Sequence, residues 1–381
     1  MSNPFKFGKI VDESIFVNRE NDRFLLAQNF LNGINTILIS PRRWGKSSLV
    51  NKVALEMQAQ HPAIRFCQID MFNVRNEQEF FNYLTKQLIQ STSTQWEEWL
   101  ETAKKFISRL NPKISLGAEP NSNAEFSISL SDKKEDYIAI LDLAEKIAIE
   151  KNIKLILCID EFQNIEFFDN PLAFQKLLRA QWQKHQNVTY CLFGSKRHMM
   201  QQLFEKRSMP FYKFGDVFYL KKIETRPFKE FIVKAFAHSN KLISDELAEK
   251  LIHTVSNHSY YVQKLAHYLW NKTEKEATEN LLNEAIDLMV QSQLPLLEKE
   301  FESLSNAQVQ LMRMLASGVR EGFSTAENIQ KFRLGSSANV ARMMKALESK
   351  EVIDLFGKKP EFIDPVFEIW LRDYIFKQYK L

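Results

Sequence analysis

A short apolar stretch that runs into a basic, glycine-containing loop constrains this chain most strongly. Residues 34–53 read Ile-Asn-Thr-Ile-Leu-Ile-Ser-Pro-Arg-Arg-Trp-Gly-Lys-Ser-Ser-Leu-Val-Asn-Lys-Val. The pattern predicts a buried strand, a tight loop and the start of a helix. From Ser40 to Ser47 it matches G-x-x-x-x-G-K-[ST] except at the first position, where Ser40 replaces glycine. The stretch therefore predicts a phosphate-binding loop, in which Lys46 contacts β- and γ-phosphate oxygens and the Ser47 hydroxyl ligates Mg²⁺.

An acidic pair at the end of a second apolar run supports this interpretation. Residues 153–161 read Ile-Lys-Leu-Ile-Leu-Cys-Ile-Asp-Glu, the pattern of a central parallel strand that carries carboxylates at its C-terminal end. Asp160 would hold Mg²⁺ through water, and Glu161 would orient or deprotonate an attacking water. Together the two motifs predict a catalytic nucleotide site rather than a strand-turn-helix without a ligand.

Composition sets the broad class. The 381 residues are 45% hydrophobic and 26% charged, which is ordinary for soluble globular proteins and allows two or three domains. No apolar stretch reaches the roughly 18 residues that a membrane span needs, and the first residues lack a signal-peptide core. We therefore expect a cytoplasmic protein without a membrane partner. Each of the three cysteines lies in an apolar run, where a reduced core residue is expected: Cys67, Cys158 and Cys191.

The order of helix and strand patterns divides the chain into three parts. Residues 1–227 predict an α/β P-loop NTPase core with a parallel sheet, interrupted at about 92–135 by an inserted helix and β-hairpin that offers a partner surface. Residues 228–303 predict an all-α lid, with helices at 228–238, 244–256, 259–275 and 278–302. A final part follows at 304–381.

Polar residues at strand ends supply further candidates for the nucleotide site. Ser195 ends the apolar strand 187–195 and would lie beside the γ-phosphate. Lys196 and Arg197 follow, and either reach a phosphate, in this subunit or a neighbour, or form an exposed turn. Asp70 ends the strand 64–70 and either faces the cleft or caps a turn.

Three further candidates lie outside the loop and the strand ends. Phe16 and Val17 precede the first helix, where they would either contact adenine or belong to the core. His258 begins a lid helix, where a nucleotide contact is the alternative to the commoner cap or packed residue.

The last part has the pattern of a winged helix-turn-helix. Helices are expected at 306–316, 324–332 and 336–350, two strands within 352–364, and an amphipathic helix at 365–379. The third helix would enter a DNA major groove with Ser337, Asn339, Arg342 and Lys345 outward, while Lys358 and Lys359 would touch the backbone. Twelve basic against nine acidic residues over 304–381 give a net charge of only +3, so DNA binding and protein docking both remain open.

The combined motifs resemble the archaeal-ATPase-like family, P-loop ATPases related to AAA+ and STAND proteins and to origin-recognition ATPases. The resemblance rests on Phe16-Val-Asn-Arg-Glu20, Ser40-Pro-Arg-Arg-Trp-Gly-Lys-Ser47, Leu157-Cys-Ile-Asp-Glu-Phe-Gln163, Phe193-Gly-Ser195 and the C-terminal winged helix. Ser40 and Asn18 replace glycines that are usual in the family, and Asn257-His-Ser-Tyr-Tyr261 replaces its frequent Gly-x-Pro.

The resemblance implies roles for individual residues. Lys46 and Ser47 would bind phosphate and Mg²⁺, Asp160 and Glu161 would be the Walker B pair, and Ser195 would act as a sensor. Adenine would lie by Phe16, Val17 and Arg19. The remaining ATP-binding residues would be those of the loop and its helix: Pro41, Arg42, Arg43, Trp44, Gly45 and Ser48.

The sequence thus predicts an ATP-binding, Mg²⁺-dependent ATPase whose nucleotide state moves the lid and the winged helix. Turnover is expected to be slow unless ATP-driven homo-oligomerisation places an arginine in trans, and Arg42, Arg43 and Arg197 are the candidates. One alternative is a nucleotide-gated switch that signals to a protein partner with little hydrolysis. Another is a DNA-binding regulator, using Arg342 and Lys345, that ATP only tunes.

Overall fold

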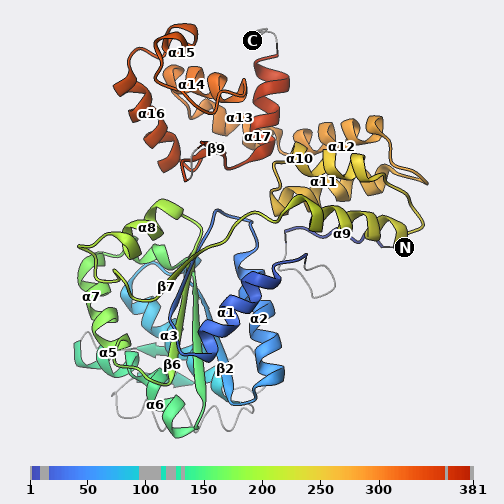
Figure 1. The fold of residues 1–381 in the computed structure, drawn as a ribbon. Coiled ribbons are helices and arrows are strands. Elements are labelled where there is room, and N and C mark those ends of the chain that lie inside the picture. The colour runs from blue at the N-terminus through green and yellow to red at the C-terminus, as the bar shows by residue number, and fades with distance from the viewer. Residues whose placement is uncertain are drawn as a thin grey trace. The chain divides into compact units, whose positions relative to one another are not determined.

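The chain forms two compact units (Figure 1). The computed structural model describes residues 2–8, 17–93, 113–116, 126–129, 134–356 and 359–377. Arg19–Lys221 make up the first unit, here called the core unit. Met1–Asn18 and Lys222–Leu381 make up the second, here called the C-terminal unit. The first residues of the chain thus fold with its second half.

The core unit is built on a parallel sheet with the strand order β2-β5-β6-β1-β7. Its described elements are α1 (Glu20–Leu31), β1 (Thr36–Ile39), α2 (Lys46–Gln60), β2 (Ile64–Asp70), the 3₁₀ turn η2 (Met71–Asn73), α3 (Glu77–Thr92), β3 (Lys113–Leu116), β4 (Phe126–Ser129), α5 (Lys134–Leu141), α6 (Leu143–Glu150), β5 (Lys154–Asp160), the 3₁₀ helix η4 (Phe162–Phe167), α7 (Pro171–Trp182), β6 (Val188–Gly194), α8 (Arg197–Glu205) and β7 (Asp216–Tyr219). The predicted parallel α/β fold is confirmed.

The sheet is covered on both faces, which explains why its strands are almost continuously apolar. Leu155, Leu157 and Ile159 of β5 are buried in one apolar cluster with side chains of α3, α6 and α7. Helices α1 and α2 lie on the opposite face (Figure 1), where the ring of Phe30 meets that of Phe66 at 5.7 Å. Strand β6 lies between β5 and β1, so the ends of all three strands meet at one edge.

The inserted region contains the expected hairpin, because β3 and β4 pair antiparallel. The helix expected before it lies outside the described residues. After the hairpin, α5 and α6 meet at Asp142, whose ψ of −9° departs from the helical value.

The C-terminal unit is mostly helical. Its described elements are α9 (Thr225–His238), α10 (Asp245–Thr254), α11 (Ser259–Lys272), α12 (Glu279–Gln291), α13 (Leu294–Glu302), α14 (Asn306–Ala316), α15 (Ala326–Lys331), α16 (Ser337–Ser349), β8 (Ile353–Asp354), β9 (Glu361–Phe362), α17 (Pro365–Trp370) and the π-helix η5 (Leu371–Ile375). The single helix expected over 278–302 is wrong. Helix α12 ends and α13 begins just before Pro295, which lacks the N–H that a helix interior needs but fits a first turn.

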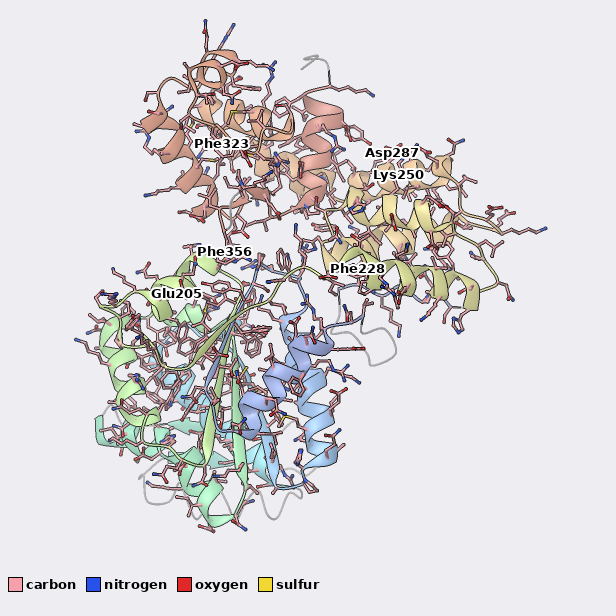
Figure 2. The ribbon with its side chains drawn as sticks, in the orientation of Figure 1. Glu205, Phe228, Lys250, Asp287, Phe323 and Phe356 are labelled. Atoms are coloured by element: carbon pink, nitrogen blue, oxygen red, sulfur yellow. The ribbon has the colours of Figure 1, made fainter. Side chains whose placement is uncertain are left out.

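The last elements of the unit share one apolar cluster with α9–α13. Strands β8 and β9 pair antiparallel through two residues each. The helix expected over 365–379 ends its α-helical part at Trp370 and continues as η5. Tyr374 of η5 donates to Asp287 of α12, which Figure 2 labels. This bond connects η5 to the preceding helices.

Asp364, at the start of α17, interacts with residues of α17, α11 and α13. One carboxylate oxygen accepts from the backbone of Val366 and Phe367 at 2.7 and 3.3 Å. The other accepts from the hydroxyl of Tyr261 on α11. Burial, reinforced by the charge of Asp364, raises the pKa of Glu300 on α13 to about 7.

This carboxyl makes the stability of the C-terminal unit depend on pH. From its ordinary pKa of 4.5 up to about 7, Glu300 is ionised in the unfolded chain but protonated in the folded one, so stability falls as pH rises through this window. We expect Glu300→Gln to stabilise the protein above pH 7 by on the order of 2 kcal/mol and to flatten the pH dependence. Thermal unfolding between pH 5 and 8 measures this. Glu298→Gln, at an exposed position of the same helix, is the control; an equal gain there would contradict the assignment.

Candidate nucleotide-binding site

The loop between β1 and α2 has the backbone that phosphate binding requires. Gly45 has a φ of 95° and Arg43 a φ of 63°, so the left-handed region that favours glycine is used at these positions. Ser40 is fully buried and its φ lies outside that region, which explains how serine can replace the first glycine. The backbone N–H groups of Gly45, Lys46 and Ser47 donate to no acceptor among the described residues. These donors at a helix N-terminus fit an anion.

Lys46 is buried at the start of α2. Its ammonium donates to the carbonyl oxygens of Ser40 at 2.9 Å and Pro41 at 3.1 Å. Burial lowers its pKa to about 8, the charges of Glu161 and Asp160 oppose this fall, and those of Arg42 and Arg197 add to it. At neutral pH the ammonium is therefore charged, and phosphate oxygens can take the places of the loop carbonyls.

Ser47 and Asp160 form the part of the site suited to a metal ion. The Ser47 hydroxyl donates to Asp160 Oδ2 at 2.6 Å, and Asp160 Oδ1 accepts from the backbone of Glu161 at 2.8 Å. Burial raises the pKa of Asp160 to about 6, although the hydrogen bond from Ser47 opposes the rise. A hydroxyl and a carboxylate are ligands that Mg²⁺ accepts. No cluster of three or more His, Cys, Asp or Glu that could hold a metal ion is found in the described parts of the chain.

Glu161 is fixed through one oxygen. Its Oε2 accepts from the Ser195 hydroxyl at 2.8 Å, from the Ser195 backbone at 3.4 Å and from the amide of Gln163. Arg42 Nε in turn donates to Ser195 Oγ at 3.3 Å. The structure therefore brings together Glu161, Ser195 and Arg42. Gln163 had no assigned role, and its only signal was its place within the Asp-Glu-Phe-Gln motif.

The remaining strand-end candidates differ in their surroundings. Arg197 begins α8, is only 9% exposed, and its guanidinium carbon lies 5.7 Å from the Trp44 ring. It thus lies beside the loop of its own chain. Lys196 lies 5.2 Å from the ring of Phe167. Asp70 accepts from the backbone of Phe72 at 2.9 Å, so it caps a turn.

Arg19 joins the segment before α1 to the loop. Its guanidinium donates to the carbonyl of Trp44 at 2.8 Å, to the carbonyl of Lys221 at 3.0 Å and to Asp22 at 2.9 Å. Asn18 has a φ of 53°, a conformation that asparagine tolerates better than most residues, which explains its presence at a position where the related motif has glycine. Val17 packs against the apolar core of the C-terminal unit. Phe16 lies outside the described residues.

The site candidates in the C-terminal unit lie on different elements. His258 precedes α11, is buried, and its ring lies 4.9 Å from that of Tyr261. Arg342 and Lys345 are exposed on α16, and Arg342 donates to Asn339 at 2.8 Å. Lys359 pairs with Glu321 at 3.2 Å. Lys358 lies outside the described residues.

The double carbonyl contact of Arg19 can be tested by a conservative change. Lysine keeps the charge but lacks the planar set of donors that spans two carbonyls and a carboxylate. We expect Arg19→Lys to lower the free energy of unfolding by about 2 kcal/mol. Arg23→Lys, which alters a partly exposed ion pair between Arg23 of α1 and Glu56 of α2, should cost under about 1 kcal/mol. Chemical denaturation compares them, and equal losses would contradict the bridging role.

Comparisons with known proteins agree with this geometry. Residues 44–190 match the model of a family described as the KAP family P-loop domain. The fold is similar to that of the Walker-type ATPase PABY2304 of Pyrococcus abyssi, with a TM-score of 0.67 and 16% identity over 97% of this chain and 99% of that one. It is also similar to Aeropyrum pernix ORC2 in ADPNP-ADP complexes, with a TM-score of 0.57 and 15% identity over 98% and 99% of the two chains.

Two negative findings complete the comparison. No curated protein sequence matches the chain. Within the described ranges, the helices are all too short or too polar to cross a bilayer. The expected P-loop NTPase fold is confirmed. Residues 44–190 are therefore similar to the P-loop domain that the KAP family model describes.

Proposed function

We propose that the chain binds ATP with Mg²⁺ and hydrolyses it. The observation that carries the proposal is the bond between Ser47 and Asp160, which joins the phosphate-binding loop to the acidic end of β5. Glu161, the next residue, is anchored on Ser195 at the end of β6. A cation, a hydroxyl, a metal-binding carboxylate and a candidate base thus meet at one edge of the sheet. This is the set of groups that phosphoryl transfer to water requires.

Each group has a distinct task in this proposal. The loop N–H groups and Lys46 bind the β- and γ-phosphates, as backbone donors and a cation do in P-loops. Ser47 and Asp160 would hold Mg²⁺, which neutralises charge on the phosphate oxygens. Glu161 Oε1 accepts no hydrogen bond from the described residues, so it can accept a proton from water while Oε2 remains anchored.

Adenine nucleotide is the ligand that the comparisons favour. The Aeropyrum pernix ORC2 structures are complexes with ADPNP and ADP, and a second ORC2 structure is an ADP form, with a TM-score of 0.54 and 15% identity over 92% of this chain and 90% of that one. We carry adenine over to this chain, with Phe16 and Val17 as its neighbours.

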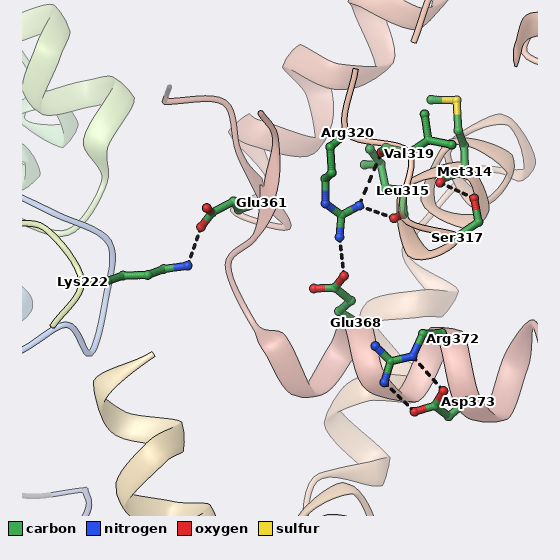
Figure 3. Close-up of polar contacts among 10 residues, drawn as sticks. All are labelled: Lys222, Met314, Leu315, Ser317, Val319, Arg320, Glu361, Glu368, Arg372 and Asp373. Carbon is green, nitrogen blue, oxygen red and sulfur yellow. Dashed lines mark hydrogen bonds and ion pairs between the residues drawn. The ribbon is translucent and has the colours of Figure 1, made fainter. Parts of the chain in front are cut away.

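A route from the loop to the C-terminal unit supports coupling between the two. Arg19 binds the carbonyls of both Trp44 and Lys221, and Lys221 is the last residue of the core unit. The next residue, Lys222, forms an ion pair with Glu361 of β9 (Figure 3). A change at Trp44 on nucleotide binding would thus reach the junction of the units.

The C-terminal unit would be the moving part. In this proposal 228–303 act as a helical lid and 304–381 as a winged helix, with 1–227 as the ATPase core. Within the last part, Arg320 of the α14–α15 connection pairs with Glu368 of α17 (Figure 3), which would make it move as one body. Arg342 and Lys345 keep DNA binding through α16 as a prediction from the sequence.

Slow turnover by the isolated chain is part of the proposal. Arg42 and Arg197 lie near Lys46 of their own chain. An arginine supplied by a neighbouring subunit raises phosphoryl-transfer rates by roughly 10³ to 10⁵. ATP-driven homo-oligomerisation would therefore complete the enzyme. A nucleotide-gated switch with little hydrolysis is the outcome if assembly does not occur.

Steady-state ATP hydrolysis over a range of protein concentrations tests the function. We expect turnover per chain to rise with concentration and to fall at least about 100-fold in Lys46→Ala and Glu161→Gln, because these remove the phosphate cation and the base. Lys52→Ala, which removes a cation that pairs with Glu56 on the same helix, should retain activity.

Each outcome decides between the alternatives. Tight ATP binding without turnover at every concentration would support the switch. Turnover that survives in both site variants would show that hydrolysis comes from elsewhere and would contradict the proposal.

A charge swap tests the coupling. We expect Lys222→Glu and Glu361→Lys each to reduce the effect of an ATP analogue on the rate of limited proteolysis, and the double variant to restore it, because only the double variant re-forms an ion pair. The pair is partly exposed, so a severalfold change is the expected size. Reversal of the Lys250–Glu279 pair, within the helical part of the C-terminal unit (Figure 2), is the control. A double variant no better than the singles would contradict the coupling.

A further inference from the structure

Gln163 is a fully buried polar residue in direct contact with the candidate base. Its side chain has 0% exposure and lies on η4, two positions after Glu161. Its amide donates to Glu161 Oε2, the oxygen that also accepts from the Ser195 hydroxyl. Burying an amide costs free energy unless it forms strong hydrogen bonds. A bond to a carboxylate is among the stronger ones.

Strand β6 leaves the space that this amide occupies. A Cβ atom at Gly194 would lie 1.9 Å from Gln163 Oε1 and 3.1 Å from its Cδ. Any side chain at this position would therefore displace the amide. Oε1 itself has no hydrogen-bond partner in the described parts of the chain. The hydrogen bond of this amide is therefore made by its nitrogen, which donates to Glu161.

Glu161 needs such support. Its backbone has a φ of 51°, a left-handed conformation that costs free energy for a residue other than glycine and persists only when its surroundings fix it. The donors from Gln163 and Ser195 all converge on Oε2. They fix the direction of the carboxylate and leave Oε1 for a proton.

We propose that Gln163 is a positioning residue that orients Glu161 for proton abstraction, in the space that Gly194 leaves for its amide. The inference rests on the proposed ATPase function. Gln163 touches neither nucleotide nor water in this mechanism and acts through Glu161. Its loss should therefore slow the chemical step and leave nucleotide affinity unchanged.

Gln163→Met tests the role, because methionine has a similar size and lacks the donor. Displacement of a reacting group by about 1 Å costs roughly 100-fold, so we expect kcat to fall about 10- to 100-fold. KM and the Kd of a non-hydrolysable ATP analogue should stay within about twofold, since phosphate binding does not involve Gln163. Gly194→Ala, with Gln163 intact, should lower kcat in the same way. A loss of folding alone would instead change binding and thermal unfolding together.

Gln175→Met is the matched control. Gln175 of α7 is as buried as Gln163. Its amide also donates to a carboxylate, that of Glu166 on η4, the 3₁₀ helix that carries Gln163. Its Oε1 likewise lacks a hydrogen-bond partner among the described residues. It does not contact Glu161, so kcat should remain within about twofold of the unaltered chain. If Gln175→Met lowers kcat as much as Gln163→Met does, the effect is structural and the inference is overturned.

A crystal structure of Gln163→Met separates failure of this inference from failure of the proposed function. In the unaltered chain, Ser195 Oγ lies 2.8 Å from Glu161 Oε2. We expect the Glu161 carboxylate to move away from Ser195 Oγ in the variant. An unmoved carboxylate, or an unchanged kcat beside an active parent chain, overturns the inference and leaves the ATPase intact. A parent chain without turnover overturns the ATPase, and the position of the carboxylate then decides the role of Gln163.

Discussion

The nucleotide site of the core unit depends on the buried ammonium of Lys46 and its attraction to the carboxylates of Glu161 and Asp160. The pKa of Lys46 is lowered to about 8 and that of Asp160 is raised to about 6, so both remain charged near pH 7. Charges in such a place are costly unless they are compensated. The carbonyls of Ser40 and Pro41 satisfy the ammonium, and the Ser47 hydroxyl satisfies the carboxylate. The loop, the first turn of α2 and the end of β5 therefore depend on one another.

The parts of the site that the sequence could predict are those that local patterns carry. The loop and the acidic pair are local patterns in apolar strands, so Lys46, Ser47, Asp160 and Glu161 could be assigned directly. The expected order of parallel strands put Ser195 at a strand end beside the expected γ-phosphate, whereas its hydrogen bond to Glu161 is seen only in the structure. Gln163 could not be assigned, because its burial depends on a gap at Gly194 on another strand. The break before Pro295 was a local signal that an otherwise helical pattern obscured.

Long-range polar contacts were equally beyond prediction. Arg19 has three partners, and two are backbone carbonyls, Trp44 and Lys221, which no side-chain pattern reveals. The ion pair of Lys222 with Glu361 likewise joins residues far apart in the chain. In the proposed function, these contacts would link the loop to the start of the C-terminal unit, because Lys221 and Lys222 are consecutive. The motifs alone give a nucleotide site, whereas the contacts supply the proposed means of coupling it.

Equilibrium binding of ADPNP to the unaltered chain and to Ser47→Ala, with and without Mg²⁺, tests whether this site holds a nucleotide together with a metal ion. We expect Mg²⁺ to tighten binding to the unaltered chain, because Ser47 and Asp160 would hold the ion beside the phosphates. We expect Ser47→Ala to lose most of this tightening and still to bind nucleotide through Lys46 and the loop. Absence of binding to the unaltered chain, or the same Mg²⁺ effect in both proteins, would contradict the proposed site.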